Sequence, residues 1–338
     1  MPERNARAIV TGGCGFIGSH LTELLLDEGL EVLVIDNLAT GRLENLAHRQ
    51  GDKNLSIVEA DVRDAETIDA LFEGAQLVFH LAALADIVPS IERPTEYLQT
   101  NVDGTVNALV SAQRCGVRRF IYAASSSCYG VPDQFPTPES SPPRPQYPYA
   151  LSKLLGEQCV LHWGQVYRLP VLSLRLFNVF GPRSRTAGSY GAVFGTFLRQ
   201  KLAQRPFTVV GDGEQTRDFV FVTDVARAFW AAACADTSRE VYNVGSGRPH
   251  SVNRLVELLG GEKVQLPRRP GEPDCTHADI SRIEGALGWA PTVSFEQGVE
   301  RVLEQIDYWR EAPLWDEQSI GRATASWFKY LSSDRERD

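Results

Sequence analysis

The sequence predicts an α/β protein with a doubly wound parallel sheet and a smaller C-terminal α/β domain. Over the first 175 residues, short runs rich in Val, Ile and Leu alternate with stretches of helical periodicity, which is typical of parallel βαβ units. Beyond residue 178 the pattern is less regular and richer in Gly, Pro and Arg. Because 338 residues have room for about two domains, these observations predict a division near residue 178.

Each expected element follows from its own residue pattern. The expected strands are short apolar runs, at 7–11, 31–35, 56–59, 77–80, 119–123 and 171–176. The expected helices carry apolar residues three or four positions apart, at 19–28, 64–73, 95–115 and 149–168. The segment 308–331 is rich in aromatic residues, so we expect it to form helical structure packed against the rest of the protein.

Composition disfavours several classes of protein. The formal net charge is −9, which argues against binding to a nucleic-acid backbone. The longest apolar runs are far shorter than the roughly 20 residues of a membrane span, and the N-terminus has no signal-peptide pattern. The six cysteines are scattered and the six histidines form no metal-binding motif. We therefore expect a cytoplasmic protein with reduced thiols and no metal site.

A glycine-rich segment, TGGCGFIG, lies between the first expected strand and the first expected helix. Gly12, Gly15 and Gly18 allow a tight turn, close approach of the backbone to a pyrophosphate, and close packing of the helix on the strand. The helix N-terminus near Phe16 and Ile17 adds partial positive charge. A plain loop would carry the same glycines, so this motif alone does not predict a nucleotide site.

Asp36 distinguishes a plain loop from a dinucleotide site. It follows the second expected strand, where a carboxylate accepts hydrogen bonds from the adenosine ribose hydroxyls and repels a 2′-phosphate. This position predicts NAD rather than NADP as the cofactor. The simpler alternative is an Asp that caps the turn before Asn37. Asn37 is also expected at the cofactor, and residues after the third and fourth strands are expected to flank the adenine and ribose: Asp61, Val62, Leu81, Ala82 and Ala83.

A second group of residues indicates proton transfer. Tyr149 and Lys153 are four residues apart, on one face of an expected helix, and the hydroxyl-rich segment Ser125–Ser127 precedes them. A tyrosine with an ordinary pKa of about 10 accepts a proton at neutral pH only if its phenolate is stabilised. Lys153 and the positive nicotinamide ring would both lower that pKa. Taken alone, such a Tyr–Lys pair is more often a solvated helix face.

With these motifs in place, the chain resembles the extended short-chain dehydrogenase/reductases of the nucleotide-sugar epimerase/dehydratase family, and most of all UDP-hexose 4-epimerases. The resemblance covers roughly residues 7–305. The motifs that carry it are TGGCGFIG, HLAA, NVDGT, SSSCYG, YALSK, LRLFNVFGPR and GDGEQTRDFVFVTDV. It implies a Rossmann-type NAD-binding domain at 1–177, to which about 216–246 returns, and a nucleotide-sugar-binding domain with a helical tail at 178–338.

The resemblance also implies roles for individual residues. Ser125 would be the catalytic hydroxyl, Tyr149 the proton acceptor, and Lys153 the residue that binds the nicotinamide ribose. Asn101 would lie at the NAD site. The residues implied at the nucleotide sugar are Ser126, Asn178, Arg217, Arg269, Glu272 and Thr276, with Gly211–Gly213 at the base.

The expected reaction is epimerisation at C4 of a UDP-hexose or a UDP-N-acetylhexosamine through a 4-keto intermediate. Related dehydratases carry a Glu, often after an Asp, directly behind the catalytic hydroxyl, whereas here these positions are Ser126 and Ser127. Neither serine is an efficient general acid or base. The alternatives are 4,6-dehydration, epimerisation or decarboxylation of UDP-glucuronate, and 4-keto reduction. A further alternative is a dinucleotide-sensing protein without activity, although such proteins commonly lose the Tyr–Lys pair.

Thr276 predicts which substituent fits at C2 of the sugar. It lies two residues before Ala278 and Asp279, where glucose-restricted epimerases carry a bulky tyrosine. The smaller side chain predicts room for a 2-acetamido group. Alternatively, Thr276 only ends a loop and neighbours such as His277 shape the pocket.

Several other residues and one surface carry expectations. Arginines in the second half of the chain are expected to concentrate positive charge on a pyrophosphate, with Arg185 and Arg268 instead at the surface: Arg175, Arg183, Arg185, Arg217, Arg268 and Arg269. We expect His80 to be buried beside the cofactor loop, and Cys128 to pack on the active-site strand. As in the family it resembles, the protein is expected to form a homodimer through helices 95–115 and 149–168.

Overall fold

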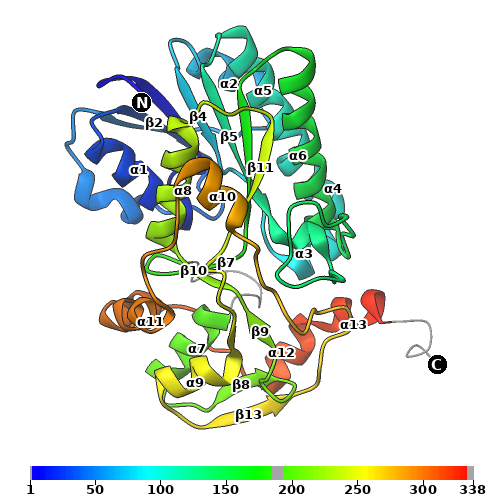
Figure 1. Ribbon diagram of the computed structural model, residues 1–338. Coiled ribbons are helices and arrows are strands. Elements are labelled where there is room, and N and C mark those ends of the chain that lie inside the picture. The colour runs from blue at the N-terminus through cyan, green and yellow to red at the C-terminus, as the bar shows by residue number, and fades with distance from the viewer. Residues whose placement is uncertain (1, 185–192, 333–338) are drawn as a thin grey trace.

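The computed structural model describes residues 2–184 and 193–332, which form two lobes (Figure 1). The larger lobe holds a seven-stranded sheet in the order β11-β6-β5-β4-β1-β2-β3, and all its neighbouring strands are parallel. The strands are β1 (Arg7–Thr11), β2 (Glu31–Asp36), β3 (Leu55–Glu59), β4 (Leu77–His80), β5 (Arg119–Ser125), β6 (Val171–Leu176) and β11 (Glu240–Val244). The predicted doubly wound α/β class is confirmed.

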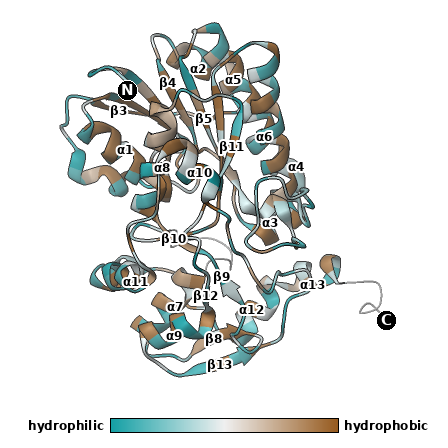
Figure 2. Ribbon diagram, in the orientation of Figure 1, coloured by the Kyte–Doolittle hydropathy of each residue, from teal (hydrophilic) through white to brown (hydrophobic). Residues whose placement is uncertain are grey.

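Helices cover both faces of this sheet. On one face lie α1 (Phe16–Asp27) and α8 (Val222–Cys234), and on the other lie α2 (Ala65–Leu71), α5 (Gly104–Arg114) and α6 (Pro148–Val166). Successive residues of β1 point to opposite faces, so that Val10 joins the hydrophobic core on the α1 side and Ile9 the core on the α5 side. Figure 2 shows hydrophobic residues along the central strands.

The expected helix at 95–115 is interrupted. It consists of α4 (Pro94–Leu98), a π-helical turn over Gln99–Asp103, and α5. The wide turn directs Asn101 inward, where its side-chain amide bonds Leu84 and Ser152. The expectation of one regular helix was therefore wrong. The buried hydrogen bonds of Asn101 offset the cost of the irregular turn.

The smaller lobe is built from short paired strands around a core of aromatic rings. The pairs are β8 (Phe207–Val210) with β13 (Lys263–Leu266), β9 (Thr216–Arg217) with β12 (His250–Ser251), and β7 (Asn178–Phe180) with β10 (Phe219–Phe221). Its helices are α7 (Val193–Leu202), α9 (Val252–Leu259) and α11 (Phe295–Glu304). Phe180, Phe194, Phe219 and Phe295 pack ring against ring in its centre.

The chain returns to the large sheet after entering the smaller lobe. Within 216–246, α8 packs on α1 and β11 pairs with β6, whereas β9 pairs with β12 outside the large sheet. Helix α10 (Ser281–Leu287) then packs beside β11. The boundary near residue 177 stays a prediction.

The C-terminal segment is helical and packed, as predicted. It comprises a 3₁₀ turn at Ile306–Trp309 followed by α12 (Glu317–Ala323) and α13 (Ala325–Leu331). Trp309, Ile320 and Trp327 are buried, and α13 packs against α3 (Ile87–Glu92) of the larger lobe. Within the described residues, no helix combines the length and apolar character needed to cross a membrane.

Candidate active site

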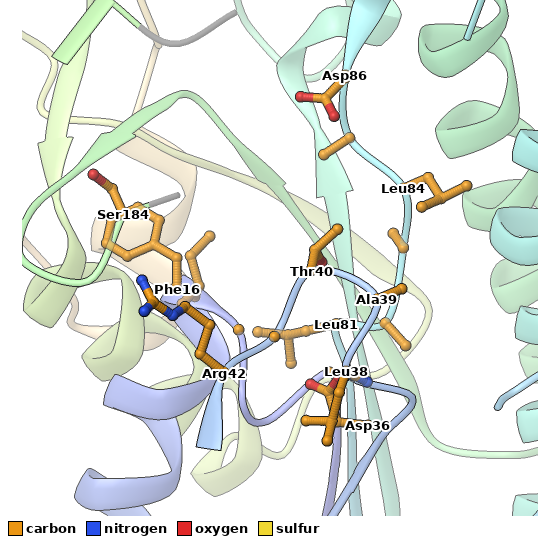
Figure 3. A pocket seen from close by; sticks show the side chains of 18 of the residues that line it. Phe16, Asp36, Leu38, Ala39, Thr40, Arg42, Leu81, Leu84, Asp86 and Ser184 are labelled. Carbon is orange, nitrogen blue, oxygen red and sulfur yellow. Dashed lines mark hydrogen bonds between the residues drawn. The ribbon is translucent and has the colours of Figure 1, made fainter. Parts of the chain in front are cut away.

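A cavity of about 780 Å³ opens where the parallel strands of the large sheet end (Figure 3). The glycine-rich loop forms one wall. Gly12 has a φ of +71°, and a Cβ there would lie 2.8 Å from the backbone nitrogen of Ala82. A Cβ on Gly18 would lie 2.1 Å from the carbonyl oxygen of Gly12. Both positions therefore require glycine, as the predicted tight turn and close helix packing demand.

The start of α1 and the end of β2 supply opposite charges to this cavity. Helix α1 begins at Phe16 with no acidic residue in its first turn, so its free N–H groups favour an anion there. The Asp36 carboxylate accepts backbone hydrogen bonds from Cys14 at 3.0 Å and Leu38 at 2.9 Å. Burial raises the pKa of Asp36 above its usual value. This arrangement fits NAD, with the pyrophosphate at α1 and a ribose at Asp36.

The residues predicted to flank the adenine and ribose differ in their positions. Most line the cavity: Asn37, Val62, Leu81, Ala82 and Ala83, together with Phe16 and Ile17 of the loop. The carboxylate of Asp61 instead bonds Asn37 at 2.8 Å and Arg63 at 2.7 Å. Arg63 holds the pKa of Asp61 well below its usual range. Direct contact of Asp61 with the cofactor stays a prediction.

Asn101 holds the loop that follows β4. Its side-chain oxygen accepts from the Leu84 nitrogen at 2.8 Å, and its amide nitrogen donates to the Leu84 carbonyl at 2.9 Å and to Ser152 at 2.8 Å. The side chain thus joins the cofactor wall to α6. A contact with NAD itself stays a prediction for this residue.

Tyr149 and Lys153 lie in the first turns of α6. Neither is among the residues that line the two cavities, but Tyr149 hydrogen-bonds Ser125 and stacks on Tyr147, which both line a second cavity. The Lys153 ammonium lies 4.3 Å from the centre of the buried Tyr122 ring, and burial lowers the pKa of Lys153 to about 7. In the protein alone burial also raises the pKa of Tyr149, although a hydrogen bond with Ser125 opposes this. The expected lowering of the Tyr149 pKa is therefore not seen in the chain itself, because desolvation outweighs the hydrogen bond with Ser125.

Ser125, Ser126 and Ser127 line the second cavity, of about 360 Å³. The Ser127 hydroxyl donates to Ser125 at 2.8 Å, so Ser125 retains its own proton for Tyr149 or for a ligand. The strand ends at Ser125, and Ser126–Tyr129 forms a 3₁₀ turn. The expectation that Cys128 lies on the strand was wrong, but it is buried and packed as predicted, and burial raises its pKa to about 12.

The second cavity also holds most of the residues implied at the nucleotide sugar. Arg217 donates to Glu272 at 2.8 Å, and the Arg269 guanidinium lies 3.8 Å from the other oxygen of that carboxylate. The Thr276 hydroxyl donates to Asn178 at 2.8 Å and accepts from the Asp218 nitrogen at 3.0 Å. All of these except Asp218 line the cavity, as does Ser126. Their roles remain predictions.

The remaining arginines separate into distinct environments. Arg175 is buried and binds Glu157 through bonds of 2.6 to 3.2 Å, so its expected contribution to a pyrophosphate site was wrong. Arg183 lines the first cavity, where its guanidinium bonds both carboxylate oxygens of Glu23 at 2.9 Å. Arg268 is exposed, as predicted. Arg185 lies outside the described residues.

Residues from the C-terminal segment line both cavities, which sequence reasoning missed. Tyr308, Ala312, Pro313 and Trp315 line the first cavity, and Trp327 lines the second. Their aromatic content predicted packing, but no local pattern indicated the surface on which they pack.

The fold and the first cavity define a dinucleotide-binding protein of the doubly wound α/β class. Residues 8–245 match the NAD dependent epimerase/dehydratase family, to which the chain belongs. The UDP-glucose 4-epimerase of Mycolicibacterium smegmatis is 35% identical over 306 residues, covering 88% of this chain and 97% of that protein. The UDP-glucuronic acid decarboxylase 1 of Xenopus tropicalis is 33% identical over 308 residues, covering 88% and 71%.

Solved structures agree with this assignment. The UDP-glucose 4-epimerase of Thermotoga maritima, solved with UDP-glucose, has a TM-score of 0.84 at 35% identity, covering 89% of this chain and 99% of that one. The UDP-glucose 4-epimerase of Thermus thermophilus, solved with NAD, has a TM-score of 0.79 at 34% identity, covering 91% and 100%. The protein is an NAD-dependent enzyme, and the predicted cofactor is confirmed.

Proposed function

We propose that the protein epimerises C4 of a UDP-hexose or a UDP-N-acetylhexosamine. The observation that carries this proposal is the row of hydroxyls at Ser125–Ser127. Among described residues that line the second cavity, Glu272 is the one carboxylate, and it is paired with Arg217 and Arg269. A dehydratase needs an acid and a base beside C5 and C6 to eliminate water. The row of hydroxyls at Ser125–Ser127 therefore favours a reaction that needs no elimination of water.

The side chains then have complementary roles. Tyr149 takes the proton of the C4 hydroxyl, and Ser125, hydrogen-bonded to Tyr149, steadies the same oxygen. Lys153 supplies positive charge that stabilises the phenolate. NAD, when bound, accepts the hydride from C4 and returns it. Arg217 and Arg269 hold the diphosphate while the 4-keto sugar turns, so that the hydride returns to its other face and Tyr149 gives back the proton.

A substrate panel in deuterated water tests the proposal. UDP-glucose, UDP-N-acetylglucosamine and UDP-glucuronate are incubated with the enzyme, and products are resolved by NMR. We expect the C4 epimer of a neutral sugar without deuterium on carbon, because the same hydride returns. A 4-keto-6-deoxy sugar labelled with deuterium would indicate dehydration, and a UDP-pentose would indicate decarboxylation. Either of these results would overturn the proposal, as would the absence of all products.

We also propose a homodimer through α4, α5 and α6. Large apolar side chains remain exposed along these helices and directly after α6: Leu98, Val110, Leu151, Val166 and Tyr167. Burying them against a second copy would remove this surface from water. Light scattering is expected to give twice the 37.4 kDa of one chain, and a Leu151→Glu variant is expected to shift the mass toward one chain. A strict monomer of the unmodified protein at micromolar concentration contradicts this. The cytoplasmic location stays a prediction.

A further inference from the structure

The C-terminal helix α13 reaches the second cavity from the side of the larger lobe. It packs on α3, and its Ser326 hydroxyl donates to Glu92 of that helix at 2.8 Å (Figure 1). On its other side, the Trp327 side chain lines the cavity while remaining only 5% exposed. The family motifs end near residue 305, so they do not predict this wall.

The indole of Trp327 is fixed by three contacts. Its ring nitrogen donates to the carbonyl oxygen of Pro270 at 2.7 Å. The guanidinium carbon of Arg269 lies 5.4 Å from the ring centroid, within the range of a cation–π contact. The centre of the Tyr147 ring lies 6.2 Å from that of the indole, and Tyr147 itself stacks on Tyr149. Trp327 therefore holds both the backbone and the charged group of the segment 269–270.

The contact with the indole matters because Arg269 has a long side chain with many possible rotamers, which the contact restricts. Its side chain is 9% exposed and contacts both the indole and Glu272. A guanidinium that rests on an aromatic face still directs its N–H groups to an anion, here the Glu272 carboxylate at 3.8 Å. It also loses less conformational freedom on binding, because the side chain is already ordered.

We propose that Trp327 is a positioning residue for the substrate diphosphate, which acts by holding Arg269 toward the second cavity. The inference rests on the proposed function only in that the second cavity receives a nucleoside diphosphate. It does not depend on which sugar is bound or on which reaction follows.

Calorimetric titration of the full-length enzyme with UDP and with UMP tests this role. Trp327→Ala is expected to weaken UDP binding about tenfold and UMP binding less, because UMP has one phosphate fewer. Trp327→Phe keeps an aromatic face but loses the bond to Pro270, so we expect an intermediate loss. In turnover assays with whichever UDP-sugar the enzyme epimerises in the substrate panel, KM is expected to rise for Trp327→Ala. The kcat is expected to change less than about twofold, because the residue acts on binding.

A double-mutant cycle separates positioning from general packing. If Trp327 acts through Arg269, Arg269→Ala with Trp327→Ala binds UDP about as weakly as Arg269→Ala alone. Trp163→Ala is the matched control, because Trp163 of α6 packs on Tyr167, the residue after that helix, and lines neither cavity.

Several outcomes would overturn the inference. These are unchanged UDP affinity in Trp327→Ala, equal losses for UDP and UMP, additive losses in the cycle, or the same loss in Trp163→Ala. If the unmodified enzyme binds none of UDP, dTDP and GDP, the inference and the proposed function both fail. If it binds UDP without epimerising any sugar, only the proposed reaction fails.

Discussion

The hydroxyl of Tyr308 donates a 3.0 Å hydrogen bond to the side-chain oxygen of Asn45, 263 residues earlier in the chain. The amide nitrogen of the same Asn45 donates at 2.8 Å to the carbonyl of Cys14, inside the glycine-rich loop. Arg42 lies over the Tyr308 ring, with its guanidinium carbon 5.4 Å from the centroid. The C-terminal segment therefore braces the loop that would receive the pyrophosphate.

Tyr308→Phe is expected to weaken NAD binding while leaving the fold intact. The variant loses the hydrogen bond of the hydroxyl to Asn45, worth about 0.5–1.5 kcal/mol, together with its hydrogen bond to Arg42, so we expect the Kd for NAD to rise at least roughly twofold. Titration of protein stripped of NAD measures this change. Tyr330→Phe is the control, because Tyr330 lies in the same segment with its side chain exposed. Equal NAD affinity in both variants would show that the brace does not affect the cofactor.

Tyr149→Phe is expected to abolish turnover and to retain NAD. The phenyl ring preserves the stacking with Tyr147, and only the hydroxyl that would carry the proton is lost. Loss of a general base typically lowers the rate by about 10²–10⁴-fold. Absorbance of NAD released on denaturation checks the cofactor content. Activity of the variant equal to that of the unmodified enzyme would refute the assigned role of Tyr149.

Asp86→Asn is expected to move the acid limb of the pH profile of kcat to lower pH. Burial is the main cause that raises the pKa of Tyr149, and the Asp86 carboxylate raises it further. Removing that negative charge lowers the Tyr149 pKa, so the phenolate forms at a lower pH. In Figure 3, Asp86 and Asp36 lie toward opposite ends of the first cavity. An unchanged profile contradicts the coupling, and complete loss of activity would mean that Asp86 acts directly.

His80 is expected to contribute to acid sensitivity of the fold. It is buried, as predicted, between the hydroxyls of Thr11 at 2.8 Å and Thr105 at 3.0 Å. Burial, aided by the charge of Lys153, lowers the pKa of His80 to about 3. The unfolded chain, with an ordinary pKa of about 6.5, therefore takes up one more proton between these values.

Stability from this group is complete above pH 6.5 and is lost as the pH falls toward 3, by at most about 1.4 kcal/mol per pH unit. In His80→Gln, the free energy of unfolding is expected to fall less steeply with decreasing pH over this range. Urea unfolding at pH 4.5, 5.5 and 6.5 measures the slope. His162→Gln, which removes an exposed imidazole, is the control. Parallel slopes in the unmodified protein and His80→Gln would contradict the argument.

The parts of the site that could be predicted depend on short-range spacing. Gly12, Gly18 and Asp36 belong to one strand–helix–strand unit, so their spacing alone places them around one cavity. Tyr149 and Lys153 share one helix. Parallel pairing then brings the C-terminal ends of successive strands to the same edge of the sheet, which accounts for the position of Ser125.

The rest could not be predicted, because it depends on partners far apart in sequence. Neither Tyr308 nor Trp327 carries a pattern that indicates which surface it contacts. Arg175 was misread for the same reason, since its partner Glu157 lies on a different element and neutralises it in the core. The π-helical turn at Gln99–Asp103 is supported by bonds of Asn101 to two distant segments, which helical periodicity does not reveal.

Thr276→Tyr is expected to remove activity on N-acetylated sugars while sparing activity on UDP-glucose. The Thr276 side chain lines the second cavity beside Asn178, so a phenol there fills space that a 2-acetamido group would need. Overpacking costs about 1–3 kcal/mol, which corresponds to a roughly 5- to 150-fold preference between the two substrates. The ratio of kcat/KM for UDP-N-acetylglucosamine and UDP-glucose measures it.

Thr276→Val supplies the matched control for this ratio. The hydroxyl of Thr276 joins Asn178 to the backbone of Asp218, and tyrosine would break that link as well as add bulk. Valine breaks the link at almost unchanged volume, so it is expected to lower kcat/KM for both substrates by the same factor and to leave the ratio unchanged. If the ratio changes in Thr276→Tyr but not in Thr276→Val, the bulk of the side chain sets the preference between C2 substituents. Equal changes in the two variants would mean that Thr276 supports the loop and that another residue sets the sugar preference.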